Sequence, residues 1–398
     1  MANCKNCMEL TYSTSRPTSN FYAPNTISQN GDKIFIVYDI NATNSNNLEA
    51  ELFFNNDGKL SVINKISADL QYPHVNGGKA STCFTKFSIL DDNGINTARI
   101  RLFDHNLNLL TTKLFKDYYA SGFSLNGGCF SQNSEYIAVS YVYDPNIGKN
   151  YQKTVIRILK SDNLSEVASY KYDGYTHIPS EFFSINNGEK NITYLVTSST
   201  GGKYDAGEII SKAPAVLKIL ELKLSISTLD LIYEVELPEI FKYDLLKISK
   251  KSIYIMIGTN RADISSEVIL QNKPNKSFLE YDGDEFRVYK FKNNKLKLIN
   301  KKNFGLNIEA KFFPSNKIIA LIKNNNGCSF IELIRVDKYF CPLQPLQNAT
   351  SMIPNKSCIN FSDNGKWAII TGSRADNYLA GPDLLKNVLL FKINSDCV

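Results

Sequence analysis

Short apolar strands alternate with tight polar turns along the whole chain. Residues 130–141, FSQNSEYIAVSY, are typical, because a polar turn there precedes a run of β-branched and aromatic residues. Such residues favour strands, and no stretch shows the 3.6-residue period of a long amphipathic helix. The pattern therefore predicts an all-β chain of short strands joined by turns.

The same unit recurs seven times along the sequence. Each unit has a strand, a tight turn, a second apolar strand, a loop, and two further strands joined by another tight turn. The first turns are assigned to Asn30-Gly31, Gly77-Gly78, Asn133-Ser134, Asn187-Gly188, Lys250-Lys251, Ser315-Asn316 and Asn364-Gly365. Their mean spacing of about 56 residues suits a four-stranded propeller blade with loop insertions. We predict a seven-bladed β-propeller of four-stranded antiparallel blades, one domain over residues 1–398.

The apolar runs also predict where the strands of each unit lie. Second strands are expected at residues 33–40, 81–90, 135–143, 191–198, 252–258, 317–323 and 366–372. Third strands are expected at residues 48–54, 98–103, 154–160, 215–223, 285–292, 329–336 and 387–393. Fourth strands, such as 59–66, 165–172 and 295–302, are more polar, as expected for a solvent-facing edge. The sixth unit has Pro342 and Pro345 in this region, which predicts an irregular outer strand.

The last unit lacks a fourth strand, and the start of the chain offers one. Residues 9–15, ELTYSTS, alternate apolar and polar side chains. We expect them to pair with residues 387–393 and to close the ring, which would remove an exposed edge. Closure would also bring Cys4 and Cys7 near Cys397, either as a disulfide or thiol cluster or as free cysteines.

Three segments resemble WD-repeat propeller units: residues 361–373, 130–141 and 98–106, with Phe103-Asp104 where that family has Trp-Asp. The sequence has no Gly-His dipeptide, and its one Trp, Trp367, lies on a different strand. The chain is therefore similar to a divergent WD-repeat propeller, and the resemblance implies blade architecture rather than a particular partner. Residues 286–299, FRVYKFKNNKLKLI, resemble lactonase-type propellers more weakly, which implies a hydrolase as the alternative.

Sequence motifs that carry catalysis are missing. No Walker loop, Rossmann fingerprint, His-Glu-x-x-His or nucleophile elbow occurs, and His74, His105 and His177 fall in three different units. A general base requires partners that this spacing does not supply. We expect a protein without enzymatic activity, cofactor or metal. A cytoplasmic location is expected, because neither a signal-peptide core nor 18 consecutive apolar residues occur.

Loop lengths predict a binding face. In a blade, the loop between strands two and three and the connection to the next blade leave from one face. The longest insertions, residues 144–153, 199–214, 259–284 and 373–386, are all of the first kind. Tyr and Arg dominate interface hot spots, so the predicted site for a protein partner comprises Tyr151, Tyr204, Arg261, Phe278, Tyr281, Arg374 and Tyr378. The alternative is that these side chains only brace their own loops; the oligomeric state stays open.

The fifth unit is basic. Residues 240–305 contain 14 Lys or Arg against 7 Asp or Glu, in a chain of net charge +6. Lys290, Lys292, Lys295 and Lys297 alternate along its outer hairpin. These lysines indicate either a solvated edge that resists pairing with other sheets or a surface for an anionic partner, nucleic acid or membrane. The modest net charge argues against a protein that coats nucleic acid.

Overall fold

The computed structural model describes most of the chain, and the regular structure of that part consists of strands. The description leaves out residues 1–6, 19–24, 39–47, 70, 73, 94, 119–124, 144–152, 174–180, 187–190, 200–202, 206–207, 212–215, 237–244, 249–253, 259–284, 304–307, 315–316, 326–327, 336–340, 351–355, 374–383 and 395–398.

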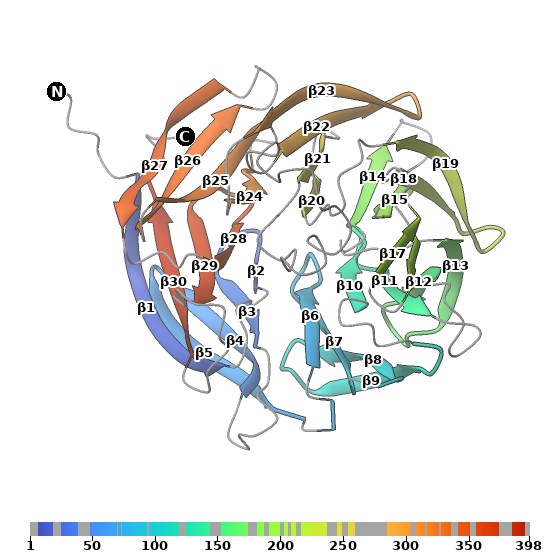
Figure 1. Ribbon diagram of the computed structural model, residues 1–398. Helices are drawn as coiled ribbons and strands as arrows, with labels where there is room; N and C mark the ends of the chain where they lie inside the picture. The colour runs from blue at the N-terminus through green and yellow to red at the C-terminus, as the bar shows by residue number, and fades with distance from the viewer. Residues whose placement is uncertain are drawn as a thin grey trace.

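The described strands form six blades of four antiparallel strands each, arranged around a centre (Figure 1). Blade 1 contains β2 (Asn25–Ile27), β3 (Lys33–Val37), β4 (Leu48–Asn56) and β5 (Lys59–Ser67). Blade 2 contains β6 (His74–Ala80), β7 (Lys86–Asp92), β8 (Ala98–Asp104) and β9 (Leu109–Phe115). Blade 3 contains β10 (Leu125–Phe130), β11 (Tyr136–Tyr143), β12 (Lys153–Lys160) and β13 (Glu166–Asp173).

The remaining three blades follow the same order. Blade 4 contains β14 (Glu181–Asn186), β15 (Asn191–Ser199), β18 (Val216–Lys223) and β19 (Thr228–Glu236). A two-stranded hairpin, β16 (Lys203–Asp205) and β17 (Glu208–Ser211), lies between β15 and β18 in the chain. Blade 5 contains β20 (Leu245–Ile248), β21 (Tyr254–Gly258), β22 (Glu285–Lys292) and β23 (Lys295–Asn303). Blade 6 contains β24 (Ile308–Phe312), β25 (Ile318–Asn325), β26 (Cys328–Arg335) and β27 (Cys341–Thr350).

A further four-stranded sheet joins the two ends of the chain. This terminal sheet has the order β1 (Met8–Thr18), β30 (Leu384–Ile393), β29 (Trp367–Ser373) and β28 (Lys356–Phe361). The pairing runs antiparallel from Met8 opposite Ile393 to Thr18 opposite Leu384. The predicted pairing of residues 9–15 with 387–393 is therefore confirmed, as is an all-β propeller of four-stranded antiparallel blades. Cys7, at the start of this sheet, is disulfide-bonded, whereas Cys4 and Cys397 lie outside the described residues.

Apolar cores lie between neighbouring sheets. Phe35 and Phe87 meet between blades 1 and 2, with ring centroids 4.7 Å apart. Phe313 and Phe361 meet between blade 6 and the terminal sheet at 4.9 Å, and Trp367 packs into the core between that sheet and blade 1. The terminal sheet is thus held on both sides by burial of aromatic side chains, which is the main driving force for sheet packing.

One turn joins the first and second strands in four of the sheets. A serine hydroxyl accepts a hydrogen bond from the amide that opens the second strand, at 2.9–3.0 Å. Three residues after that serine the backbone has a positive φ, which explains glycine at two of the positions. The serines are Ser28, Ser81, Ser131 and Ser362, and the residues with positive φ are Gly31, Phe84, Ser134 and Gly365. This recurrence shows that the sequence unit is a structural repeat.

The prediction for the second turn was wrong. Gly77 and Gly78 lie inside β6, opposite Leu90 and Ile89, and the turn falls at residues 81–86. The Gly-Gly pair therefore serves close packing: a Cβ on Gly78 would lie 2.3 Å from Cγ2 of Val37 in blade 1. The second strand accordingly begins at Lys86 instead of residue 81, whereas the other six begin within two residues of prediction.

The outer strands differ in regularity. Residues Asp57 and Gly58, and likewise Asn293 and Asn294, have positive φ, as required by a two-residue type I′ hairpin. In blade 6, β27 pairs with β26 through three register shifts around its two prolines, which confirms the predicted irregular edge. Within the described residues, no helix is long and apolar enough to cross a membrane.

Candidate partner interface

Strand bounds define a face that carries the long connections. In an antiparallel blade, the connection from strand two to strand three and the connection to the next blade leave from the same end. The gaps from Val37 to Leu48, from Tyr143 to Lys153 and from Gly258 to Glu285 are all of the first kind. The hairpins at residues 57–58 and 293–294 lie at the other end. We call the first end the loop face.

Most residues predicted to bind a partner fall in these loops. Tyr151, Arg261, Phe278, Tyr281, Arg374 and Tyr378 lie outside the described residues. Tyr204 lies in β16, opposite Ile209 of β17, so its strand belongs to a hairpin within the blade 4 loop. The structure therefore places one member of the set and leaves the grouping of the seven as a prediction.

A buried chain of ion pairs, which we call the Arg101 cluster, lies beside this face between blades 1 and 2. Arg101 contacts the carboxylates of Glu49 in β4 and Asp91 in β7. Arg99 donates to both oxygens of Asp91, at 2.5 and 3.1 Å, and binds Asp69 at 2.6 Å. Glu49 and Asp91 are fully buried. The cluster therefore joins three pieces of chain: blade 1, blade 2 and the connection between them.

Burial dominates the electrostatics of this cluster. It raises the pKa of Glu49, although Arg101 binds that carboxylate, and it also raises the pKa of Asp91. Burial opposes ionisation of Asp69 as well, but hydrogen bonds from Arg99 and the Gln71 amide outweigh it and lower its pKa. Three carboxylates thus face two guanidinium groups. The two buried carboxylates, Glu49 and Asp91, are held there at a cost in desolvation free energy.

An aromatic ring also fixes the connection between blades 1 and 2. The guanidinium carbon of Arg99 lies 3.8 Å from the centroid of Tyr72, within the range of a cation–π contact. After the outer strand of blade 2, Tyr118 donates to Asp92 at 3.0 Å. Both connections are therefore tied to blade 2, whose four strands lie between them in sequence.

A second group, the Arg157 cluster, ties a connection between blades to blade 3. Arg157 binds Asp117 and Glu166, each at 2.6 Å, and its Nε donates to the Tyr141 hydroxyl at 2.5 Å. Tyr141 in turn donates to Asp117 at 2.7 Å. Burial and this hydrogen bond raise the pKa of Tyr141 well above its ordinary value. Asp117 belongs to the connection from blade 2, so this cluster also fixes a link between blades.

The same two positions of the repeat supply a polar pair in three consecutive blades. The first position lies five residues after the first residue of the second strand. The second position lies on the third strand, three residues before the residue that pairs with the first residue of the second strand. The pairs are Tyr38 with Glu51, Asp91 with Arg101, and Tyr141 with Arg157. Our sequence reasoning missed these residues, although charged residues inside apolar strands, as in ARIRLF and TVIRILK, were a signal of paired burial.

The charged side chains of these two clusters are engaged in ion pairs. The carboxylates of the Arg101 cluster are occupied by guanidinium groups, and His74 lies in β6 while His105 lies in the turn after β8. His177 lies outside the described residues. In the described ranges, no group of three or more His, Cys, Asp or Glu side chains could hold a metal ion. The two clusters tie the connections that contain Asp69 and Asp117 to blades 2 and 3.

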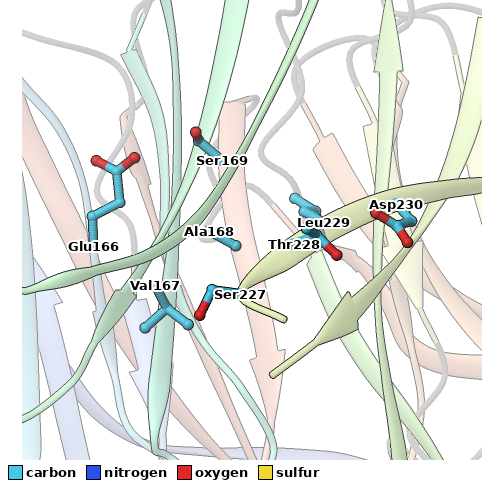
Figure 2. A pocket seen from close by; sticks show the side chains of 8 residues that line it. All are labelled: Glu166, Val167, Ala168, Ser169, Ser227, Thr228, Leu229 and Asp230. Carbon is cyan, nitrogen blue, oxygen red and sulfur yellow. The ribbon is translucent and has the colours of Figure 1, made fainter. Parts of the chain in front are cut away.

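A groove of about 540 Å³ lies on the outer wall between blades 3 and 4. Figure 2 shows its walls, residues 166–169 from β13 and 227–230 at the start of β19. The acidic residues of the groove already have cationic partners, since Glu166 binds Arg157 and Asp230 binds Lys223 at 2.8 Å. The groove is therefore not favoured as a site for a charged ligand.

The basic hairpin of blade 5 is arranged as the sequence predicts. Lys290 lies opposite Lys297, and Lys292 lies opposite Lys295, across β22 and β23. All four side chains are exposed. Like charges directly opposite each other destabilise a strand pair, so this hairpin concentrates positive charge at a cost to folding.

Comparisons with known proteins show the fold alone. No family model matches the chain, and no curated protein matches it. Among solved structures, the Dos1 propeller is similar with a TM-score of 0.54 and 8% identity, covering 97% of this chain and 95% of that one. Hydrazine synthase of Kuenenia stuttgartiensis gives a TM-score of 0.52 and 9% identity, covering 90% and 93%.

A peptidase also contains a similar domain. Prolyl oligopeptidase B from Galerina marginata gives a TM-score of 0.50 and 10% identity. The match covers 91% of this chain but 47% of that enzyme, so this chain spans about half of its length. Proteins with such different names share the architecture, and at these identities the similarity establishes a β-propeller fold and nothing about activity.

Proposed function

We propose that this chain is a protein-binding scaffold without enzymatic activity, a seven-bladed propeller of the cytoplasm whose ring is completed by the terminal sheet. The observation that carries the proposal is the braced loop face. Long connections leave from this end of the blades, and the Arg101 and Arg157 clusters fix the chain beside it in blades 1 to 3.

The physical argument concerns preorganisation. A surface that is already ordered loses less conformational entropy when a partner binds, so more of the contact energy appears as affinity. Buried ion pairs suit this role, because they hold connections at defined positions while contributing little to net stability. Loops between the blades can then vary in sequence without disturbing the strands.

The test compares two faces of the molecule. The variant Arg261→Ala/Tyr281→Ala/Arg374→Ala/Tyr378→Ala is expected to fold normally and to lose the proteins that co-purify with the tagged chain. The control, Gln132→Ala/Asp162→Ala/Lys366→Ala, changes exposed residues near the opposite end and should retain them. Loss of the same proteins in the control variant, but not in the loop variant, would place the interface at the wrong end and refute the proposal.

The basic hairpin supports a second candidate, an anionic partner. Opposed lysine pairs at Lys290–Lys297 and Lys292–Lys295 produce a local field that attracts phosphate-bearing surfaces. Binding to duplex DNA and to anionic vesicles is measured at low and high salt. If the hairpin is responsible, Lys292→Ser/Lys295→Ser/Lys297→Ser weakens binding and flattens its dependence on salt. Salt-independent binding would exclude this candidate.

A further inference from the structure

The outer strand of a propeller blade leaves one row of backbone hydrogen-bonding groups unpaired by its own sheet. Proteins oppose unwanted pairing at such edges with charged side chains, proline and irregular strands. Several outer strands described here carry these features. They include Lys59 and Lys65 in β5, Glu166 and Lys171 in β13, Glu234 and Glu236 in β19, Lys295 and Lys297 in β23, and Pro342 and Pro345 in β27.

Strand β9, the outer strand of blade 2, is different (Figure 1). Its sequence, LLTTKLF, has a single charged residue, Lys113, which is half-buried. The side chains of Leu109, Leu110 and Leu114 are 57%, 49% and 46% exposed. The pairing with β8 is regular from Thr111 to Phe115 and shifts register at Leu110, so the regular part of this apolar edge is short. Such an edge is suited to accept another strand.

The sequence of β9 is nearly symmetric about Thr112. Leucines stand two positions to either side of this residue, at 110 and 114, and Leu109 and Phe115 stand three positions away. A twofold axis through Thr112 would pair the strand with itself in antiparallel register. Leu110 of one copy then lies opposite Leu114 of the other, where apolar pairs stabilise a sheet. Twofold contacts use the same patch on both copies, so this symmetry favours a second copy as the occupant.

We propose that two copies of this chain associate through antiparallel pairing of their β9 strands. Apolar surface on blade 1 extends the contact, because Val62 and Ile63 of β5 are each 46% exposed. The adjacent Asn64 donates to the Asn106 carbonyl, so this part of β5 lies beside the turn that precedes β9. The contact is small compared with stable dimer interfaces, so the dissociation constant is on the order of micromolar.

Sedimentation velocity over roughly 1 to 200 µM tests the association. The wild-type chain is expected to shift from monomer to dimer with concentration, and Leu110→Lys/Leu114→Lys to weaken the dimer at least about tenfold, because it introduces the edge charges found on other blades. The matched control, Leu224→Lys/Ile226→Lys, replaces apolar residues that are 48% and 62% exposed in a hairpin turn of blade 4 and should leave the dimer unchanged.

Thiol cross-linking tests the register without altering the apolar residues. Residues directly opposite in an antiparallel pair have Cβ atoms about 5 Å apart, so Thr112→Cys in a Cys83→Ser background should form a cross-linked dimer under mild oxidation. Ser61→Cys, at an exposed position of β5, lies away from the twofold axis and should not form a cross-linked dimer. A chain that stays monomeric at every concentration, or a dimer that cross-links through residue 61 but not 112, would overturn the proposal.

Discussion

Removal of Arg101 is expected to destabilise the whole propeller more than its single side chain suggests. Arg101→Leu keeps an apolar stem but leaves the fully buried carboxylates of Glu49 and Asp91 without this partner. Loss of one partner from a buried ion pair costs about 3–5 kcal/mol. With an unfolding entropy of about 2.1 cal/mol/K per residue, a cooperative chain of 398 residues would lose about 4–6 °C in Tm.

Acid should reduce this deficit. Burial raises the pKa of Glu49 and of Asp91 in the folded state. At a pH between the ordinary pKa and the raised pKa of each carboxyl group, the folded chain therefore binds more protons than the unfolded chain. Stability therefore rises as pH falls toward the ordinary values of 4.5 and 3.8, and it rises more when Arg101 no longer compensates the charges.

Differential scanning calorimetry at about pH 7.5 and about pH 5.5 provides the measurement. Lys223→Ala is the control, because it breaks an exposed ion pair with Asp230 and should leave Tm within about 1 °C of wild type. Adding Glu49→Gln to Arg101→Leu should restore part of the lost stability, since it removes one buried charge that has lost its partner. Equal losses in the Arg101 and Lys223 variants, or a deficit independent of pH, would refute the role assigned to burial.

Four further outcomes follow from local features. Gly31→Ala should lower stability by about 2–4 kcal/mol, because it combines a positive φ with a Cβ only 2.3 Å from the Trp367 indole. Gly365→Ala has a similar φ but more space, so calorimetry should show only about 1–2 kcal/mol. Iodoacetamide labelling followed by mass spectrometry should give Cys83 an apparent pKa of about 7, because its hydrogen bonds with Thr85, Ser81 and Ser134 outweigh its partial burial; a profile near 9 would contradict this reasoning. Deletion of residues 1–16 should expose the edge of β30 and promote aggregation, and a truncated chain with unchanged Tm and monodispersity would contradict that pairing.

The sequence was sufficient to predict most of the strands, for a physical reason. Their apolar and β-branched residues recur with the turn chemistry that joins them, so each unit predicts its own hairpins. Prediction failed at Gly77-Gly78 because glycine serves two purposes. It permits turns, and it also permits a neighbouring strand to approach closely, as Val37 does here. The choice between them depends on contacts between blades, which one sequence does not reveal.

The site was predicted less well, because its geometry depends on register. Arg99 and Arg101 are separated by one residue in ARIRLF, a pattern that indicates one face of a strand but not its partners. Pairing of β7 with β8 places Arg99 opposite Asp91, and packing of blade 2 on blade 1 brings Glu49 to Arg101. Of the seven loop residues predicted to bind a partner, six lie outside the described residues, and the pairing of β16 with β17 places the seventh, Tyr204.

The Arg101 cluster is better understood as a device for specificity than as a source of stability. A buried ion pair contributes little compared with apolar residues of the same size, because desolvation offsets most of the attraction. An apolar contact between blades, however, tolerates small shifts, whereas Arg101 must meet Glu49 and Asp91 together and Arg99 must reach Asp69. A slip of β8 by one residue would turn both arginines to the other face of the sheet and leave the buried carboxylates without these arginine partners. The cluster therefore penalises wrong registers far more than it favours the correct one, and it does so beside the face that bears the long loops.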